Sequence, residues 1–309
     1  MSQGISQAIP GLHHVTAISG PPQDNLDFWV RTLGQRLVKR TVNFDDPGTY
    51  HLYYGDKDAA PGSIMTFFPF VDAGPGRAGP GMASAVAYAV PDLDRRMGEL
   101  AEAAIDFEGP FDRFGERVIA LKDPDGLRIE LIEGGARDEG FHSVTLWLEE
   151  VVATAELLEA MGYVREAEEA STTGGTDGVE ARIRYRSTDP ERGSAVDLMT
   201  SDARSIGRSG AGTIHHVAFR ARNQDEQLAW RARLSAAGQQ ITPVIDRQYF
   251  DAIYFRTPGG VLFEIATDPP GFAVDEDPAH LGEELKLPKK YEAHRDRIEQ
   301  VLPHIRVPK

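Results

Sequence analysis

The chain has 309 residues, of which 41% are hydrophobic, so it can bury one large core or two of ordinary domain size. Its 33 basic and 48 acidic residues give a formal net charge of −15, which repels phosphates and argues against nucleic acid or an anionic membrane as a partner. Because the sequence contains no cysteine, disulfides and thiolate chemistry are excluded, and any metal must take histidine or carboxylate ligands.

The first predicted unit opens with the strand LHHVTAISG at residues 12–20, in which two histidines stand side by side. Apolar residues then recur at helical spacing from Leu26 to Leu33, and Gly34 provides a stop signal. Two β-rich runs, TYHLYYGD and GSIMTFFPF, come next, with glycine and proline between them. This order of elements predicts a βαβββ unit.

Three further segments repeat this order. The second begins with SAVAYAV at residue 84, the third with FHSVTLWLE at residue 141, and the fourth with IHHVAFRA at residue 214. Near the ends of the second and fourth segments, KDPDGLRIE and RTPGGVLFE align residue for residue, which places Glu130 opposite Glu264. The sequence therefore predicts four βαβββ repeats.

The predicted fold class is α+β. One βαβββ unit buries only one face of its strands, so we expect four βαβββ repeats paired into two half-open barrels of about eight strands, with a helical C-terminal tail. The concave interior of such a barrel is a natural place for a ligand. We expect an N-terminal pair of repeats at residues 11–135, a C-terminal pair at residues 140–268, and the tail at residues 269–309.

Alignment of the repeats identifies candidate metal ligands. The motifs HHVT, SAVA, HSVT and HHVA place four residues at one equivalent position: His14, Ala85, Ser143 and His216. The aligned residues in the last strand of each repeat are Phe67, Glu130, Leu198 and Glu264. A buried carboxylate in an apolar strand calls for a cation partner. Two imidazoles and one carboxylate leave coordination positions open, as non-haem Fe(II) enzymes require, so His14, His216 and Glu264 are the predicted ligands.

This ligand set requires repeats one and four to share a barrel, and it leaves the second barrel without metal. The alternative is that repeat one pairs with repeat two and repeat three with repeat four, which would offer His142, His216 and Glu264 instead. In the alignment, His142 is level with His13 and not with His14, which disfavours that alternative.

Two other candidates are better explained as structural. Glu130 has Arg128 close to it in the strand LRIELIE. His51 lies in the alternating strand TYHLYYG after Asp45 and Asp46, whose sequence DDPG favours a turn and not a second metal site.

The sequence resembles the vicinal oxygen chelate superfamily, which includes glyoxalases and extradiol ring-cleaving dioxygenases, on the phrases LHHVT, FWVRTLGQRLVKRTVNFDDPGTYHLYYGD, IHHVAF and RTPGGVLFE. The likeness is strongest to a bacterial branch of ring-cleaving dioxygenases that act on hydroquinones. It extends from residue 11 to the tail motif GFAVDEDPAHLG.

The resemblance implies further site residues. It gives His215 a role beside the ligands as a proton shuttle, although strand alternation alone would direct this side chain away from the metal. Arg247 and Tyr254, in DRQYFDAIYF, match positions that hydrogen-bond the bound aromatic. Thr16 follows His14 by two residues and shares its strand face, which suits a hydroxyl near the substrate, and β propensity explains a threonine there equally well.

We therefore expect an Fe(II)-dependent ring-cleaving dioxygenase of hydroquinone-type dihydroxylated aromatics, an oxidoreductase that incorporates both atoms of O₂, with Mn, Zn or Ni as substitute metals. The alternatives are a catechol extradiol dioxygenase, a glyoxalase-type metal isomerase or lyase, and a non-catalytic quinone- or antibiotic-binding protein. Glyoxalase sites usually resemble a set of two histidines and two glutamates. In the last strand of the first repeat, Phe67 stands where the second glutamate would be needed.

The expected partners are a small aromatic substrate and O₂, with no nucleic acid and no membrane, and a homo-oligomer is compatible with the sequence. Residues 1–11 have neither a basic nor an apolar segment typical of a signal peptide, and no run of 18 apolar residues occurs. A cytoplasmic location is the resulting expectation.

Overall fold

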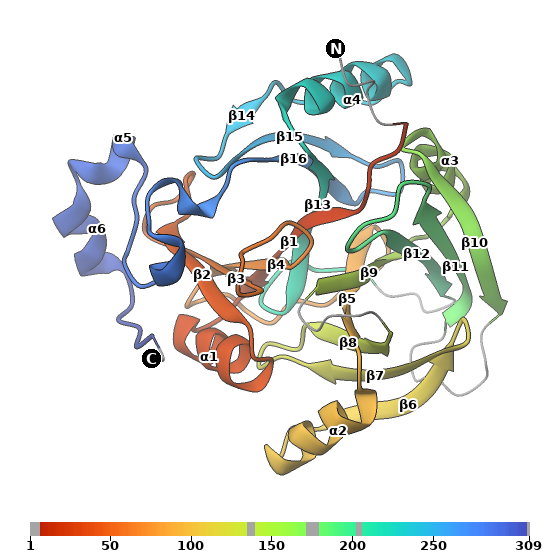
Figure 1. Cartoon of the computed structure of the whole chain (residues 1–309), viewed down its shortest axis with the longest axis horizontal. Helices are drawn as coiled ribbons and strands as arrows, with labels where there is room; N and C mark the ends of the chain where they lie inside the picture. Colours follow the sequence, from red (N-terminus) through yellow and green to blue (C-terminus); the bar gives the residue numbers. More distant parts are fainter. Residues whose placement is uncertain (1–6, 135–139, 171–178, 202–205, 308–309) are drawn as a thin grey trace.

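A computed structural model describes residues 7–134, 140–170, 179–201 and 206–307, and it confirms an α+β fold of four βαβββ repeats (Figure 1). The first repeat comprises β1 (Leu12–Ser19), α1 (Pro22–Asp27), the π-helical turn η1 (Phe28–Thr32), β2 (Arg36–Val42), β3 (Tyr50–Gly55) and β4 (Ile64–Pro69). The second comprises β5 (Met82–Val90), α2 (Leu93–Glu102), β6 (Phe107–Arg113), β7 (Glu116–Lys122) and β8 (Arg128–Glu133).

The later repeats follow the same order. The third comprises β9 (Gly140–Trp147), α3 (Val152–Ala160), β10 (Tyr163–Ala170), β11 (Val179–Ser187) and β12 (Ala195–Ser201). The fourth comprises β13 (Thr213–Ala221), α4 (Gln224–Ala236), β14 (Ile245–Asp246), β15 (Phe250–Arg256) and β16 (Leu262–Pro270).

The strands form two eight-stranded sheets, each built from a repeat of each half of the chain. The first sheet has the order β14-β15-β16-β13-β1-β4-β3-β2 and joins repeats four and one. The second has the order β10-β11-β12-β9-β5-β8-β7-β6 and joins repeats three and two. In each sheet the opening strands of the two repeats pair antiparallel at the centre, β1 with β13 and β5 with β9. Repeat one therefore does not share a sheet with repeat two, and repeat three does not share one with repeat four.

The longer helices α2, α3 and α4 lie outside the curled sheets, and each buries apolar residues on one side. In α4, Trp230 and Leu234 are buried, and the side chain of Asn223 caps the helix by accepting a hydrogen bond from the Glu226 amide. The first helical segment ends before Gly34, whose φ of +73° is in the left-handed region that favours glycine. Figure 1 shows the helices at the periphery of the two curled sheets.

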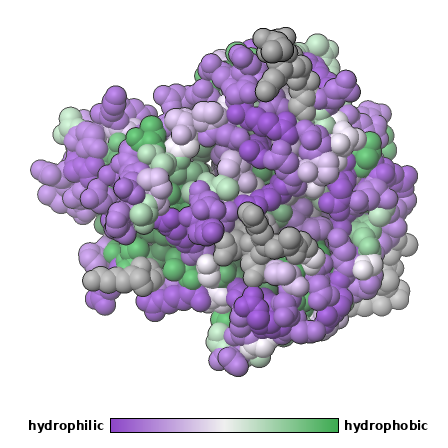
Figure 2. Space-filling view, viewed as in Figure 1, coloured by the Kyte–Doolittle hydropathy of each residue, from purple (hydrophilic) through white to green (hydrophobic). Residues whose placement is uncertain are grey.

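The C-terminal tail packs against the outer strand of the first sheet. It contains the 3-10 turns η2 (Phe272–Val274) and η3 (Pro278–His280) and the helices α5 (Lys289–Glu292) and α6 (Arg295–Val301). A β-bridge joins Leu285 to Arg40 of β2, and Ile298 of α6 is buried. Figure 2 shows apolar residues gathered where the tail meets the rest of the molecule, while most of this face is hydrophilic. The tail is therefore packed against the first sheet.

The two sheets contact each other along β5 and β13, beside a tight turn between β7 and β8. Within this turn, the carboxylate of Asp125 accepts a hydrogen bond from the Gly20 amide of the first sheet's repeat, at 2.9 Å. The turn also leaves no room for a side chain at Gly212, the residue before β13. Among the described residues, none of the helices has the length and apolar character needed to cross a bilayer.

Gly212→Ala should destabilise the protein by about 2 kcal/mol or more. Gly212 has a φ of +82°, and an added Cβ would lie 2.1 Å from the Asp125 carbonyl oxygen. Thermal unfolding measures the effect. The matched control is Gly98→Ala within α2, where nothing lies within 4 Å of an added Cβ, and this change should raise the unfolding temperature slightly. Equal effects of the two substitutions would contradict the close approach at Gly212.

The buried Asp123 should make stability depend on pH between about 4 and 7. Burial raises the pKa of its carboxyl to about 7, while the amides of Leu127 and Asp125 donate to it. The folded state then binds the proton more tightly than the unfolded chain, so the contribution is complete below pH 4 and is lost as pH rises through 7. Asp123→Asn, which keeps the acceptor, should raise the unfolding temperature at pH 8 and not at pH 4. A pH-independent effect would exclude the buried charge as the cause.

Candidate metal centre

Two rows of directly opposed residues cross the first sheet and carry most of the candidate site. One row runs over β15, β16, β13 and β1 and consists of Tyr254, Glu264, Ala218 and His14. The other runs over β3, β4, β1 and β13 and consists of Tyr53, Thr66, Thr16 and His216. The pairing of repeats one and four relates the rows to each other, so His14 corresponds to His216 and Glu264 corresponds to Thr66.

Each histidine pair lies at a β-bulge. The register between β1 and β13 shifts by one residue at His13 and again at His215, so each is an extra residue beside the histidine that follows it. A bulge re-aims the side chain of the extra residue. As a result, the Nδ1 atoms of His13 and His14 lie 2.9 Å apart and those of His215 and His216 lie 2.8 Å apart. The expectation that alternation directs His215 away from the site is therefore wrong.

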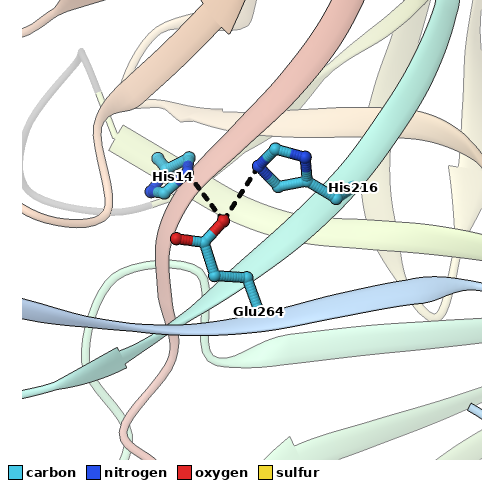
Figure 3. A group of neighbouring side chains, drawn as sticks. All are labelled: His14, His216 and Glu264. Atoms are coloured by element: carbon cyan, nitrogen blue, oxygen red, sulfur yellow. Dashed lines mark ion pairs between the residues drawn. The ribbon is translucent and has the colours of Figure 1, made fainter. Parts of the chain in front are cut away.

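Glu264 lies between the two inner imidazoles (Figure 3). Its Oε2 atom is 2.9 Å from Nε2 of His216 and 3.4 Å from Nε2 of His14, and the three side chains each offer a ligand atom within 4.8 Å of the others. Glu264 has 0% exposure, and neither carboxylate oxygen has a hydrogen-bond partner of ordinary geometry in the described part of the chain. A buried carboxylate in this condition is suited to a cation.

The protonation states also suit a metal. Burial raises the pKa of Glu264, but His14 and His216 lower it further, so that the resulting pKa is well below the usual range and the carboxyl is ionised. Burial lowers the pKa of His216 despite the opposing effect of Glu264. Partial desolvation and the neighbouring His216 lower the pKa of His215 to about 4. Neutral imidazoles and an ionised carboxylate are the forms that bind a metal.

The Nδ1 contacts determine which nitrogen of each inner imidazole faces Glu264. Because His14 and His216 use Nδ1 against the preceding histidine, their Nε2 atoms are directed to the carboxylate. A proton on Nδ1 of His14, donated to His13, leaves the Nε2 lone pair for a cation. The outer histidines thus orient the inner ones, as partners of metal-bound histidines commonly do.

The position that corresponds to Glu264 in the first repeat is occupied by Thr66. Its hydroxyl lies 2.9 Å from that of Thr16 and 2.8 Å from Nε2 of His51, whose Nδ1 is 2.8 Å from the Tyr53 hydroxyl. Phe67 was the residue expected here, and the strand register corrects that alignment by one position. A threonine that is already hydrogen-bonded supplies no second carboxylate, so this side of the site stays open.

The same correction applies to the third repeat, where Asp197 and not Leu198 occupies the equivalent position. A signal in the sequence identifies all four positions, because each follows by four residues a glycine with positive φ. These glycines are Gly62, Gly126, Gly193 and Gly260. Alignment on the turns KDPDG and RTPGG used this signal only in repeats two and four.

A cavity of about 560 Å³ opens beside the three candidate ligands. His215, Arg247 and Tyr254 line it, whereas Thr16 is fully buried behind the wall and does not. The guanidinium Nε of Arg247 donates to the Tyr254 hydroxyl at 3.2 Å. Most of the remaining wall is apolar or aromatic and includes Ile18, Phe44, Phe68, Phe70, Phe250 and Leu262. The cavity therefore combines an aromatic enclosure with several polar groups.

His51 and Tyr53 also line the cavity, and the sequence analysis missed them as site residues. His51 was expected to have only a structural role. Its described hydrogen bonds are to Thr66 and Tyr53, and none of the described ion pairs joins it to Asp45 or Asp46. The alternation of TYHLYYG could have indicated that His51 and Tyr53 share one strand face. Burial lowers the pKa of His51 well below its usual value, so this imidazole is neutral.

The second sheet has arginines at the corresponding site. Arg184 contacts both carboxylate oxygens of Asp197, at 2.7 and 3.0 Å, and Arg113 pairs with Glu130. Burial raises the pKa of Glu130, but the arginines, Arg113 first, lower it to about 2. Both carboxylates are thus neutralised without a metal.

His142 belongs to this second sheet, where it contacts the Ser143 hydroxyl and Glu116 at 3.1 Å. It lies on β9 and is separated by the sheet order from β13 and β16, which carry His216 and Glu264. The alternative ligand set of His142, His216 and Glu264 is therefore wrong.

Comparisons with known proteins agree with this architecture. A family model described as the Glyoxalase/Bleomycin resistance protein/Dioxygenase superfamily matches residues 11–131 and 165–265. The chain is 44% identical to the Bacillus subtilis (strain 168) protein named "Putative ring-cleaving dioxygenase MhqO", over 94% of this chain and 95% of that protein. It is 33% identical to a chlorohydroquinone/hydroquinone 1,2-dioxygenase of Sphingobium indicum, over 95% and 96% of the two chains.

A solved structure shows the same overall arrangement. It is the crystal structure of a protein described as a "putative dioxygenase" from Bacillus subtilis, with a TM-score of 0.88 and 41% sequence identity. The match covers 98% of this chain and 100% of that one. Both repeats of each half are therefore shared along the full length of the two chains.

Replacing His14, His216 or Glu264 by Ala should each lower Fe(II) affinity at least about 10-fold, because each change removes one of three candidate ligand atoms that lie within 4.8 Å of one another. The measurement is iron content after anaerobic equilibration and gel filtration, with circular dichroism to show that the fold is retained. His142→Ala is the matched control and should keep iron at the wild-type level. Loss of iron in His142→Ala with retention in His14→Ala would contradict the assignment.

Proposed function

The chain belongs to the Glyoxalase/Bleomycin resistance protein/Dioxygenase superfamily, and from this membership we propose that it is an Fe(II)-dependent ring-cleaving dioxygenase that acts on hydroquinone-type aromatics. The observation that carries the proposal is a buried set of two imidazoles and one carboxylate with a threonine at the fourth symmetric position. Such a set leaves several coordination positions open on one side.

The residues present fit iron. Neutral nitrogen ligands and an anionic oxygen match the two-histidine, one-carboxylate arrangement of non-haem Fe(II) oxygenases. Fe(II) held there supplies a Lewis-acidic, redox-active centre that can activate an aromatic hydroxyl and O₂ together. In the overall reaction, a ring C–C bond beside a hydroxylated carbon breaks and both atoms of O₂ are retained in the product.

His215 is the proposed acid–base group beside the substrate. When Nε2 of His216 is free for a metal, Nδ1 of His216 carries the proton and donates to Nδ1 of His215, so neutral His215 has its own proton on Nε2. A pKa of about 4 keeps this imidazole neutral at neutral pH, and its Nε2–H can donate a hydrogen bond to the substrate oxygen nearest the ligands. The side chain lines the cavity and is exposed, so this proton can exchange with solvent.

Arg247 and Tyr254 are the proposed positioning groups for the ring. The two hydroxyls of a hydroquinone stand para to each other, so only one can reach the ligands and the ring needs polar contacts elsewhere. Arg247 is fixed by its hydrogen bond to Tyr254 and by an ion pair of 3.2 Å with Asp45. These groups can hold the ring by its second hydroxyl, while the aromatic wall of the cavity excludes water.

The comparisons support the substrate class, since one relative with 33% identity over nearly its whole length is named for chlorohydroquinone and hydroquinone. A glyoxalase-type isomerase is disfavoured because Thr66 and its bonds to Thr16 and His51 occupy the position at which a second glutamate would be required. An antibiotic-binding role without catalysis is disfavoured by the three converging side chains of the candidate centre.

The test compares Fe(II)-dependent O₂ uptake with methylhydroquinone and with catechol. Wild type should have the higher kcat/KM for methylhydroquinone, and Arg247→Ala should lower that value about 10- to 100-fold while lowering the value for catechol less, because catechol can chelate the metal through adjacent hydroxyls. Arg247→Lys keeps the charge but loses the planar fork of the guanidinium. Its kcat/KM for methylhydroquinone should lie between the values of wild type and Arg247→Ala.

Two results would overturn the proposal. One is a wild-type preference for catechol that Arg247→Ala leaves unchanged, which would reject the hydroquinone assignment. The other is substantial turnover of the methylglyoxal–glutathione adduct by the Zn- or Ni-loaded protein, which would move the chain to the isomerases.

A further inference from the structure

The tail motif GFAVDEDPAHLG, residues 271–282, contacts the loop that carries Arg247. Asp275 of this motif accepts hydrogen bonds from Gln248 Nε2 at 2.8 Å and from the Tyr249 hydroxyl at 3.1 Å. Its other oxygen lies 2.6 Å from Nζ of Lys39 on β2. One tail carboxylate therefore joins the outer strand of the sheet to the two residues that directly follow Arg247.

Lys39 explains why the tail is held at this point. The lysine has 0% exposure and pairs with both Asp275 and Glu276, and its ammonium lies 4.9 Å from the centre of the Tyr249 ring. A buried ammonium without partners is costly, so both carboxylates are required at fixed positions. The ring of Tyr249 also stacks on Phe272, with centroids 5.4 Å apart.

The backbone of the Arg247 loop is equally dependent on these contacts. Gln248 has a φ of +66°, an uncommon conformation for a residue other than glycine. The Tyr249 carbonyl accepts a hydrogen bond from the Gly271 amide of the tail, at 2.9 Å. Inside the loop, the Arg247 amide donates to the Phe250 carbonyl. The tail thus holds Gln248 in two ways, through the side chain of Gln248 and through the backbone of Tyr249.

The tail also holds the opposite lip of the cavity, formed by Asn43, Phe44 and Asp45. The carbonyl of Phe44 accepts hydrogen bonds from the Tyr291 hydroxyl at 2.8 Å and from Lys290 Nζ at 3.0 Å. Asp45 then reaches across to Arg247 at 3.2 Å. Two separate parts of the tail therefore fix the two partners of one ion pair at the cavity mouth.

We propose that Asp275 is a positioning residue, which acts through Gln248 and Tyr249 to hold the Arg247 guanidinium in the orientation that receives the ring. The inference rests on the proposed function, since Arg247 is there the group that positions the substrate. Asp275 lies outside the cavity wall and touches neither the candidate ligands nor the substrate space. The tail motif is accordingly a specificity element of the cavity and not only an outer cover.

The test combines Asp275→Asn with Arg247→Ala in a double-mutant cycle, using Fe(II)-dependent O₂ uptake with methylhydroquinone. Asp275→Asn alone should raise KM about 5- to 10-fold with a smaller change in kcat, and should leave iron content unchanged. In the Arg247→Ala background the same substitution should have almost no effect, because the group it positions is absent. Tyr249→Phe, which removes only one hydroxyl, should reproduce the change in KM more weakly and is the variant that keeps the Lys39 pair.

Asp197→Asn in the second sheet is the matched control. It removes one charge from a buried ion pair with Arg184, so it should lower the unfolding temperature without raising KM. An equal rise in KM for Asp197→Asn, or an undiminished effect of Asp275→Asn in the Arg247→Ala background, would overturn the proposal.

Hydrogen exchange gives a readout that does not require turnover. Peptides that cover residues 245–250 should exchange faster in Asp275→Asn, and peptides from β9 should not. Unchanged exchange in residues 245–250 would overturn the positioning role whether or not the protein cleaves hydroquinones. Faster exchange in a protein without dioxygenase activity would instead support the positioning of Arg247 and reject the proposed function.

Discussion

The buried carboxylate of Glu264 is the constraint on which the rest of the site depends. An anion without solvent must be compensated by nearby positive charge or by hydrogen-bond donors, and the described surroundings of Glu264 provide the imidazoles of His14 and His216, both buried. The first sheet brings the three groups together only because β13 pairs with β1, which lets strands from the two ends of the chain share one face. Three features serve to bring these side chains together. They are the pairing of repeat one with repeat four, the two β-bulges, and the contacts of His13 and His215 with the histidines that follow them.

The near-symmetry of the sheet shows how a repeated unit becomes an asymmetric site. Both rows begin with a tyrosine and end with a histidine, but one has the pair Glu264 and Ala218 where the other has Thr66 and Thr16. The small alanine leaves space beside the carboxylate, whereas the two threonines bond to each other and to His51. One half of the site is thereby charged and the other is neutral. In the second sheet, arginines neutralise the equivalent carboxylates, which removes any need for a cation there.

The sequence alone allowed much of the fold to be predicted, because helical and alternating periodicities are distinct and the unit recurs four times. It also allowed prediction of which three side chains meet, since His14 and His216 occupy equivalent repeat positions and Glu264 is the carboxylate in the last strand of the repeat that carries His216. It did not reveal the bulges, because a one-residue shift is a property of two paired strands and not of either alone. Phe67 and Leu198 were assigned one position from Thr66 and Asp197 because the alignment did not use Gly62 and Gly193, which each lie four residues before the equivalent position. The tail's hold on Arg247 depends on contacts between residues distant in sequence, which no local pattern contains.

A crystal structure of the protein loaded anaerobically with Fe(II) tests the central claim most directly. The account predicts iron bound by Nε2 of His14, Nε2 of His216 and the carboxylate of Glu264, with the Nδ1 contacts to His13 and His215 retained and Thr66 still bonded to His51. It also predicts no iron beside Glu130 and Asp197. Iron bound through an Nδ1 atom, through Thr66 or His51, or in the second sheet would contradict the claim that bulged histidine pairs create the site.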